Sequence, residues 1–193
     1  MSLVVIGKIT DHVVKELNAY FSIISSVSDD HVVAGSLFDQ AGGQNSEVKD
    51  KLLVSLVNIE QDKTYHSLDI YKKTENGQSQ IIKPEIKINL YFLFIANYSV
   101  YGESLKAISR VIAFFQHRNS FDILSGAAAS DKKSHISFEL FSLTFEQQNH
   151  IWGTLGGKYI PSIMYKAGIL DIQDEQVKAE VAPVEEIWIN EDA

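Results

Sequence analysis

Apolar side chains recur every three or four residues near the start of the chain, and this spacing predicts an amphipathic helix over roughly residues 8–25. The stripe consists of Ile9, Val13, Leu17, Tyr20 and Ile24. We expect this helix to lie against a sheet. A short β-branched run at 31–38 then ends in Asp39-Gln40-Ala41-Gly42-Gly43, which predicts a strand followed by a loop.

Two longer apolar runs predict the centre of that sheet. Residues 52–59 are apolar at nearly every position, which is typical of a strand covered on both faces near the middle of a sheet. Residues 86–95 alternate, and their second half is apolar on both sides, so we expect it to be buried there as well. Between the two runs, residues 61–83 are polar. Asn76-Gly77 predicts a tight turn there, within a protruding hairpin or ordered loop.

The second half of the chain continues this alternation of helices and strands. A second helix is predicted to end at Asn119-Ser120, with an apolar stripe of Leu105, Ile108, Ile112 and Phe115 that Val111 and Phe114 widen. After a loop of small residues at 125–130, residues 136–143 alternate as a strand. Phe92, Phe94, Phe114 and Phe115 all fall on apolar stripes, so we expect them to pack in the core.

A short third helix is predicted from its capping residues. Thr144 and Gln147 have the spacing of a capping box, and Gly156-Gly157 supplies a left-handed stop after Leu155. We expect Trp152 on this helix to belong to the core. Residues 159–172 then form a long strand, whose beginning lies at an edge or a bulge because Pro161 has no N–H to donate.

These elements define an α+β fold, a mixed and mostly antiparallel sheet flanked by helices. The length of 193 residues favours one domain with an appendage. We predict an α/β domain at 1–172 and an acidic C-terminal arm at 173–193.

Composition excludes several classes of protein. The sequence contains no cysteine, which excludes a disulfide framework, a thiolate metal site and a cysteine nucleophile. Its N-terminal run lacks the features of a signal peptide, and no apolar stretch approaches the ~20 residues that span a bilayer. We therefore expect cytoplasmic synthesis and folding, with no membrane partner.

Charge is concentrated at the C-terminal end. The net charge is −8, and residues 171–193 contribute eight acids against Lys178 alone, which leaves residues 1–170 nearly neutral. This distribution argues against a nucleic-acid partner, because phosphate binding needs a concentrated positive face.

No catalytic, cofactor-binding or metal-binding residues are predicted. The six histidines never lie within four residues of one another, and no dinucleotide, nucleophile-elbow or zinc-protease motif occurs. The segment 153–159 is similar to a phosphate-binding loop, but its first glycine would have to stand at Trp152, and Tyr159 replaces the hydroxyl residue that holds magnesium.

The arm itself is a candidate binding segment. Val184, Ile187, Trp188 and Ile189 interrupt its acidic run, and a tryptophan between two isoleucines is costly to leave in water. In an extended chain, Ile187 and Ile189 lie on one side and Trp188 on the other. We predict that these four residues form an interface, as a strand added to the edge of a neighbouring sheet.

Several stretches, in their order and spacing, resemble one known family, the cap or tail-terminator proteins of extracellular contractile injection systems of the antifeeding-prophage type. The stretches are Glu16-Leu17-Asn18, residues 54–60, residues 89–94 with Ala96-Asn97-Tyr98, residues 111–116 and, most specifically, residues 152–162. The resemblance covers most of residues 1–172 and is weakest at 61–83 and after Asp171.

This resemblance implies a structural protein without catalysis or cofactors. It implies a hexameric ring that closes the ends of the tube and sheath of a phage-tail-like particle, and a tail-terminator-like fold. Its implied partners are other copies of the chain, tube and sheath subunits and, where a system encodes one, a cap paralogue. Assembly would take place in the cytoplasm, in a particle that is released from the cell. The alternative is a small α/β enzyme or ligand-binding domain, with a pocket assembled by tertiary folding.

Overall fold

The structure is a computed structural model that describes residues 5–25, 31–39, 42–43, 45–62, 70–73, 79–82, 86–124, 133–172 and 179–181. The helices are α1 (Val5–Ser25), α2 (Tyr101–His117) and α3 (Phe145–Thr154), with a short 3-10 turn, η1 (Ser46–Val48). The strands are β1 (Val32–Ala34), β2 (Lys51–Gln61), β3 (Ile70–Lys73), β4 (Ser79–Ile82), β5 (Ile86–Asn97), β6 (Ser120–Leu124), β7 (Lys133–Phe141), β8 (Ser162–Ile172) and β9 (Ala179–Val181).

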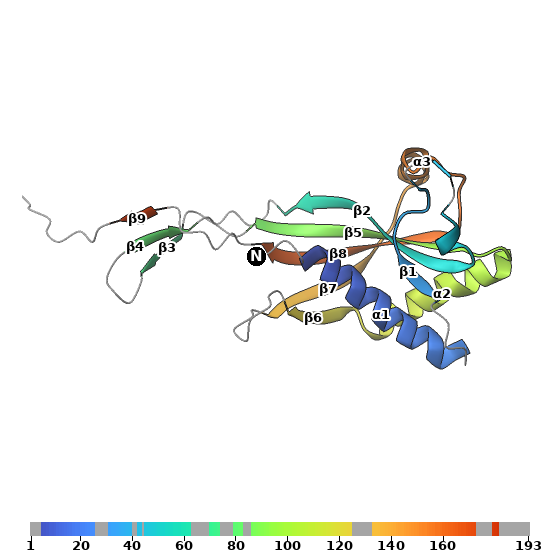
Figure 1. The fold of residues 1–193 in the computed structure, drawn as a ribbon, viewed down its shortest axis with the longest axis horizontal. Coiled ribbons are helices and arrows are strands. Elements are labelled where there is room, and N and C mark those ends of the chain that lie inside the picture. Colours follow the sequence, from blue (N-terminus) through green and yellow to red (C-terminus); the bar gives the residue numbers. More distant parts are fainter. Residues whose placement is uncertain are drawn as a thin grey trace, which may run out of the picture.

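A six-stranded sheet in the order β1-β2-β5-β8-β7-β6 forms the body of the molecule (Figure 1). The β1–β2 pair is parallel and the other pairs are antiparallel, which confirms the predicted mixed, mostly antiparallel fold. A separate sheet, β3-β4-β9, lies beyond the ends of β2, β5 and β8 that are farthest from α3 (Figure 1). No described helix is long and apolar enough to cross a membrane.

The main core lies between one face of the six-stranded sheet and helices α1 and α2. Alternate residues of β5, among them Leu90, Phe92 and Phe94, are almost fully buried under these helices. Aromatic rings fill the centre, where Phe115 stacks on Phe138 at 5.0 Å and contacts Tyr165 at 4.4 Å. The predicted core positions Phe92, Phe94, Phe114 and Phe115 are confirmed.

The opposite face of the sheet has a smaller cover. Helix α3, with Leu37, Phe38 and Val48, closes a second apolar cluster. The cluster contains Leu53, Leu93, Met164 and Trp152. Trp152 is 5% exposed, so its predicted place in the core is confirmed. The predicted capping box is also present, because Thr144 Oγ1 accepts from the Gln147 N–H while Gln147 Oε1 accepts from the Thr144 N–H. Gly156 then adopts a φ of +72°, the left-handed stop expected there.

The predicted faces of α1 and α2 are partly wrong. On α1, Ile9, Val13 and Leu17 are buried as expected, but the stripe continues through Phe21, while Ile24 is 46% exposed. On α2, the buried face begins with Ser104 and Ala107, and Leu105 and Ile112 are exposed. Ser104 Oγ donates to the Ala96 carbonyl at 3.0 Å, and this small-residue contact places Leu105 and Ile112 on the outer side of α2, while Phe114 and Phe115 stay buried.

The prediction that β2 is covered throughout is also wrong. Leu52, Leu53 and Val54 are buried, whereas Ser55, Leu56 and Val57 are half-buried and residues 58–61 are exposed. The reason is the shortness of β1, which pairs only with residues 52–54 of β2. Beyond Val54, this strand therefore changes from an inner strand to an edge strand.

Other differences concern strands. The strand predicted at 31–38 is regular only over Val32–Ala34, and β6, at the far edge, has no counterpart in the prediction. The predicted hairpin is confirmed, since β3 and β4 pair antiparallel from Ile70↔Ile82 to Lys73↔Ser79. The predicted turn at Asn76-Gly77 lies outside the described residues. β8 begins directly after Pro161, whose carbonyl accepts from the Ala96 N–H at 2.9 Å.

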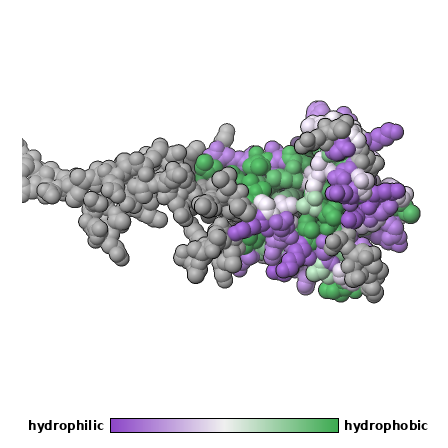
Figure 2. All heavy atoms as spheres, viewed as in Figure 1, coloured by the Kyte–Doolittle hydropathy of each residue, from purple (hydrophilic) through white to green (hydrophobic). Residues whose placement is uncertain are grey.

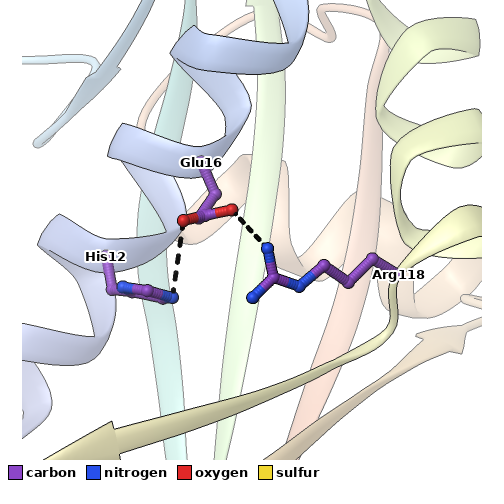
Figure 3. A network of polar contacts seen from close by, with 3 residues as sticks. All are labelled: His12, Glu16 and Arg118. Atoms are coloured by element: carbon purple, nitrogen blue, oxygen red, sulfur yellow. Dashed lines mark hydrogen bonds and ion pairs between the residues drawn. The ribbon is translucent and has the colours of Figure 1, made fainter.

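A polar cluster ties α1 to the connection between α2 and β6 (Figure 3). Arg118 Nη1 donates to Glu16 at 2.7 Å, and the His12 ring lies 4.0 Å from the other oxygen of the same carboxylate. The Arg118 guanidinium also covers the Phe121 ring at 4.8 Å. One carboxylate thus links α1 to the segment that joins α2 and β6.

Candidate interaction surface

A groove of about 1000 Å³ lies between α3 and the second half of β2. Its floor includes Ser55, Val57 and Met164. One wall is formed by Gln147, His150, Ile151 and Thr154 of α3 and by Leu155, which follows the helix. The lining also includes Thr10 of α1, so the groove continues around the edge of β2 toward the other face of the sheet. Figure 2 shows apolar side chains at the surface over β2, next to α3.

The edge of β2 beside this groove has backbone groups available for pairing. Leu52 N donates to the His31 carbonyl, and Val54 O accepts from the Gly35 N–H. The backbone N–H and C=O groups of even-numbered residues therefore point toward β1. The direction of the backbone N–H and C=O groups repeats every two residues along a strand. The N–H and C=O of Leu56 therefore point to the same edge. Among the described strands, β2 beyond Val54 pairs only with β5, with a β-bulge between Leu56 and Asn58.

The neighbouring edge of β1 is closed by a side chain. Asn18 of α1 donates from Nδ2 to the Val32 carbonyl at 2.8 Å, and its Oδ1 accepts from the Val32 N–H at 2.9 Å. These two bonds imitate a neighbouring strand. The chain therefore blocks strand addition at β1.

The polar end of the groove contains a tyrosine–glutamate pair. The Tyr91 hydroxyl donates to Glu60 Oε2 at 2.5 Å, and its ring meets Phe141 edge-on at 5.2 Å. The hydrogen bond to the carboxylate, together with burial and the negative charge of Glu60, raises the pKa of Tyr91 to about 12. A phenol with this pKa stays protonated at neutral pH, which makes it a poor proton donor or base there.

The groove has the form of a binding surface. Its lining combines hydrogen-bonding groups along the edge of β2 with an apolar floor. In the described part of the chain, no group of three or more His, Asp or Glu side chains is arranged to hold a metal ion.

A second surface consists of apolar side chains that α2 presents to solvent. Tyr101, Leu105 and Ile112 are 66%, 46% and 39% exposed. Their spacing of four and seven residues places them on one side of the helix. An exposed apolar stripe of this kind is typical of a protein–protein contact.

The predicted interface residues Val184, Ile187, Trp188 and Ile189 lie outside the described residues. Of the predicted arm at 173–193, the structure describes only β9. The groove was not predicted from the sequence. Its signal was the change within β2 from apolar residues to Ser55 and Asn58. That change indicates the strand's open half only once β1 is known to be short.

Solved structures with this fold include two from phage-tail-like particles. One is a sheath/tube terminator, in the extended state, from a PVC extracellular contractile injection system, with a TM-score of 0.56 and 10% identity over 93% of this chain and 63% of that one. The other is the tube-terminating cap of the anti-feeding prophage, with a TM-score of 0.55 and 11% identity over 91% of this chain and 58% of that one. The fold is thus that of contractile-system terminators, and the chain spans about three fifths of their length.

The sequence agrees with the fold. Residues 8–186 match the Pvc16 N-terminal domain family, and the chain belongs to that family. The resemblance to contractile-system caps and terminators, stated from the sequence, is confirmed. No curated protein sequence is similar enough to be counted as a relative.

Proposed function

We propose that this chain is a structural subunit of a cap that ends the tube and sheath of a phage-tail-like contractile injection particle. It acts through protein–protein contacts, in a hexameric ring, without catalysis or cofactors. Membership of the Pvc16 N-terminal domain family, matched over residues 8–186, is the observation that carries this proposal. The likeness of the whole fold to a sheath/tube terminator and a tube-terminating cap supports it.

The requirements of a terminator are matters of interface physics. A ring closes when one heterologous contact repeats around the symmetry axis, so each subunit needs two different complementary surfaces. Weak contacts at several equivalent sites then bind the rim of the tube by multivalency. The exposed stripe Tyr101, Leu105 and Ile112 and the groove beside β2 lie on opposite faces of the sheet, because α2 and α3 cover opposite faces. We propose that the stripe is one of the ring contacts.

The test is assembly of the full chain. Light scattering should show a ring-sized oligomer, or a monomer that becomes one when purified tube is added. Leu105→Glu is expected to abolish the ring while keeping the melting temperature, because Leu105 is exposed. The matched control is Leu140→Glu, at an exposed leucine of β7.

When the chain is mixed with particles that contain tube and sheath subunits, electron microscopy should find it at one end of them. A stable monomer that ignores tube and sheath would contradict the proposal. The particle is proposed to assemble in the cytoplasm before its release from the cell.

A further inference from the structure

We propose that the groove between α3 and the open half of β2 receives the C-terminal arm of a neighbouring copy of the chain. The arm adds to β2 as a short strand that includes Ile187, Trp188 and Ile189. This inference rests on the proposed ring, because only an assembly of several copies holds one chain's arm at another chain's groove.

The groove offers both features that strand addition uses. An added strand obtains affinity from backbone hydrogen bonds along an edge, and specificity from pockets for its alternate side chains. Leu56 presents its backbone groups to the open edge of β2, and Ser55, Val57 and Met164 form a floor beside it. Because Thr10 lines the groove from the α1 side, both faces of an added strand would meet protein.

The other edges of the sheet are protected. Asn18 occupies the outer backbone groups of Val32 on β1. At the opposite edge, Asp122 of β6 is exposed and lies 2.9 Å from His135, and charged side chains on an edge strand discourage pairing. The second half of β2 is therefore the edge best suited to receive a strand.

The arm has the length and pattern of such a strand. Residues 182–193 follow β9 and lie outside the described residues. Twelve extended residues reach about 40 Å. Ile187 and Ile189 project to one side of an extended segment and Trp188 to the other. These are the two directions in which the groove offers contacts, toward α3 and around the edge toward α1.

The direction of β9 favours a neighbouring copy over the same chain. β9 pairs with β4 from Ser79↔Val181 to Ile81↔Ala179, in the small sheet that lies beyond the end of the body farthest from α3 (Figure 1). β4 leads back toward β5 of the body, and β9 runs antiparallel to β4, so β9 heads away from the body. The arm thus begins by running away from its own groove, although the small sheet lies beyond the Gln61 end of β2. A contact between the arm of one copy and the groove of the next is heterologous, and repetition of such a contact around an axis closes a ring.

The natural sequence contains no cysteine, so introduced thiols report this contact without interference. Full-length Asn58→Cys and full-length Ile189→Cys are mixed under conditions in which rings form, and are oxidised mildly. Asn58 is exposed and lines the groove. A disulfide between two different chains is expected, because paired strands bring Cα atoms within bonding range of about 7 Å. The matched control is Asn149→Cys on α3, which is exposed and lies outside the groove lining. When it replaces Asn58→Cys in the mixture, no disulfide with Ile189→Cys should form.

Each outcome decides between defined alternatives. A ring that forms normally with no disulfide at Asn58→Cys would overturn the docking site and leave the proposed cap standing. A disulfide within single chains of the double variant Asn58→Cys/Ile189→Cys, kept dilute and monomeric, would overturn the choice of a neighbouring copy. In a further experiment, a tube or sheath subunit with an introduced cysteine in a terminal segment replaces the Ile189→Cys chain. A disulfide between that cysteine and Asn58→Cys would also overturn the choice of a neighbouring copy. If the unmodified chain forms no ring with or without tube, the proposed cap fails and the docking site fails with it.

Discussion

The Tyr91 hydroxyl on β5 and the Glu60 carboxylate on β2 share a 2.5 Å hydrogen bond across two neighbouring strands. The pair lies at the polar end of the groove, and it holds the pKa of Tyr91 at about 12. In Glu60→Gln the charge is lost, so we expect the pKa of Tyr91 to fall toward the ordinary value of about 10. NMR titration of 13C-labelled tyrosine rings measures this shift. Glu139→Gln, at an exposed carboxylate of β7, is the control that should leave Tyr91 unchanged.

The same pair predicts how stability depends on pH. The pKa of Tyr91 is raised on folding, so its contribution to the free energy of unfolding is complete below about pH 10 and is lost as the pH rises through about 12. The stability difference between the natural chain and Glu60→Gln should therefore be constant from pH 7 to about 9.5 and shrink above that. Urea denaturation at a series of pH values measures it. A difference that grows with rising pH would contradict this assignment.

Gly157 has no room for a side chain. A Cβ at this position would lie 2.9 Å from Cε2 of the Phe38 ring, and Trp152 stands 3.6 Å away on another side. We expect Gly157→Ala to destabilise the fold by about 1–3 kcal/mol, the usual effect of overpacking. Gly153→Ala, in α3 and with open space around it, should instead raise the melting temperature slightly, because alanine favours the helix. Equal melting temperatures for the two variants would refute the close contact.

Trp152 anchors α3 to the second face of the sheet. It is 5% exposed, and its ring meets Tyr159 edge-on at 5.9 Å. Trp152→Ala should lower the free energy of unfolding by about 3–5 kcal/mol, the range for a large buried aromatic side chain. Lys158→Ala, at an exposed position on the same segment, should change neither stability nor any response to nucleotide. A nucleotide-binding signal that Lys158→Ala abolished would show that this segment binds phosphate.

Asn18 is expected to contribute more to the stability of the fold than its partial exposure indicates. Its side chain satisfies both outer backbone groups of Val32, so Asn18→Ala leaves a donor and an acceptor of a buried residue without their partner. The expected cost is about 1–3 kcal/mol in thermal or urea unfolding. Asn149→Ala, at an exposed position on α3, is the control, and its stability should be close to that of the natural chain.

Each of the three consecutive residues Glu16, Leu17 and Asn18, which carry part of the family resemblance, has a structural role. Glu16 binds Arg118, Leu17 is fully buried, and Asn18 holds β1. Periodicity predicted Leu17, because helical spacing is a local property. The partners of Glu16 and Asn18 lie 102 and 14 residues away, and no local pattern predicts such pairs.

The same distinction accounts for the groove. The capping box, the glycine stop and β5 were predicted because their signals lie within a few neighbouring residues. The open half of β2 depends instead on the length of another strand, β1, and on the α1 side chain that closes it. The outward faces of Leu105 and Ile112 likewise depend on the contact between Ser104 and Ala96.

The C-terminal arm provides the last prediction. A chain that ends at Ile172 lacks both the arm and β9, which pairs with β4, so it also alters the small sheet. A chain that ends at Val181 keeps β9 and removes residues 182–193 alone. We expect it to keep its helix and strand content and its thermal transition, because the six-stranded sheet and its cores lie within residues 5–172.

The shortened chain should lose ring stability or attachment to particles, and Trp188→Ala should reproduce much of that loss. Acids flank the apolar residues of the arm, so attachment of the full chain should weaken with added salt if they face a basic partner. Gel filtration and sedimentation with particles measure both effects. If the chain ending at Val181 assembles and caps particles as well as the full chain, the arm only keeps the protein soluble, and its role as an interface is refuted.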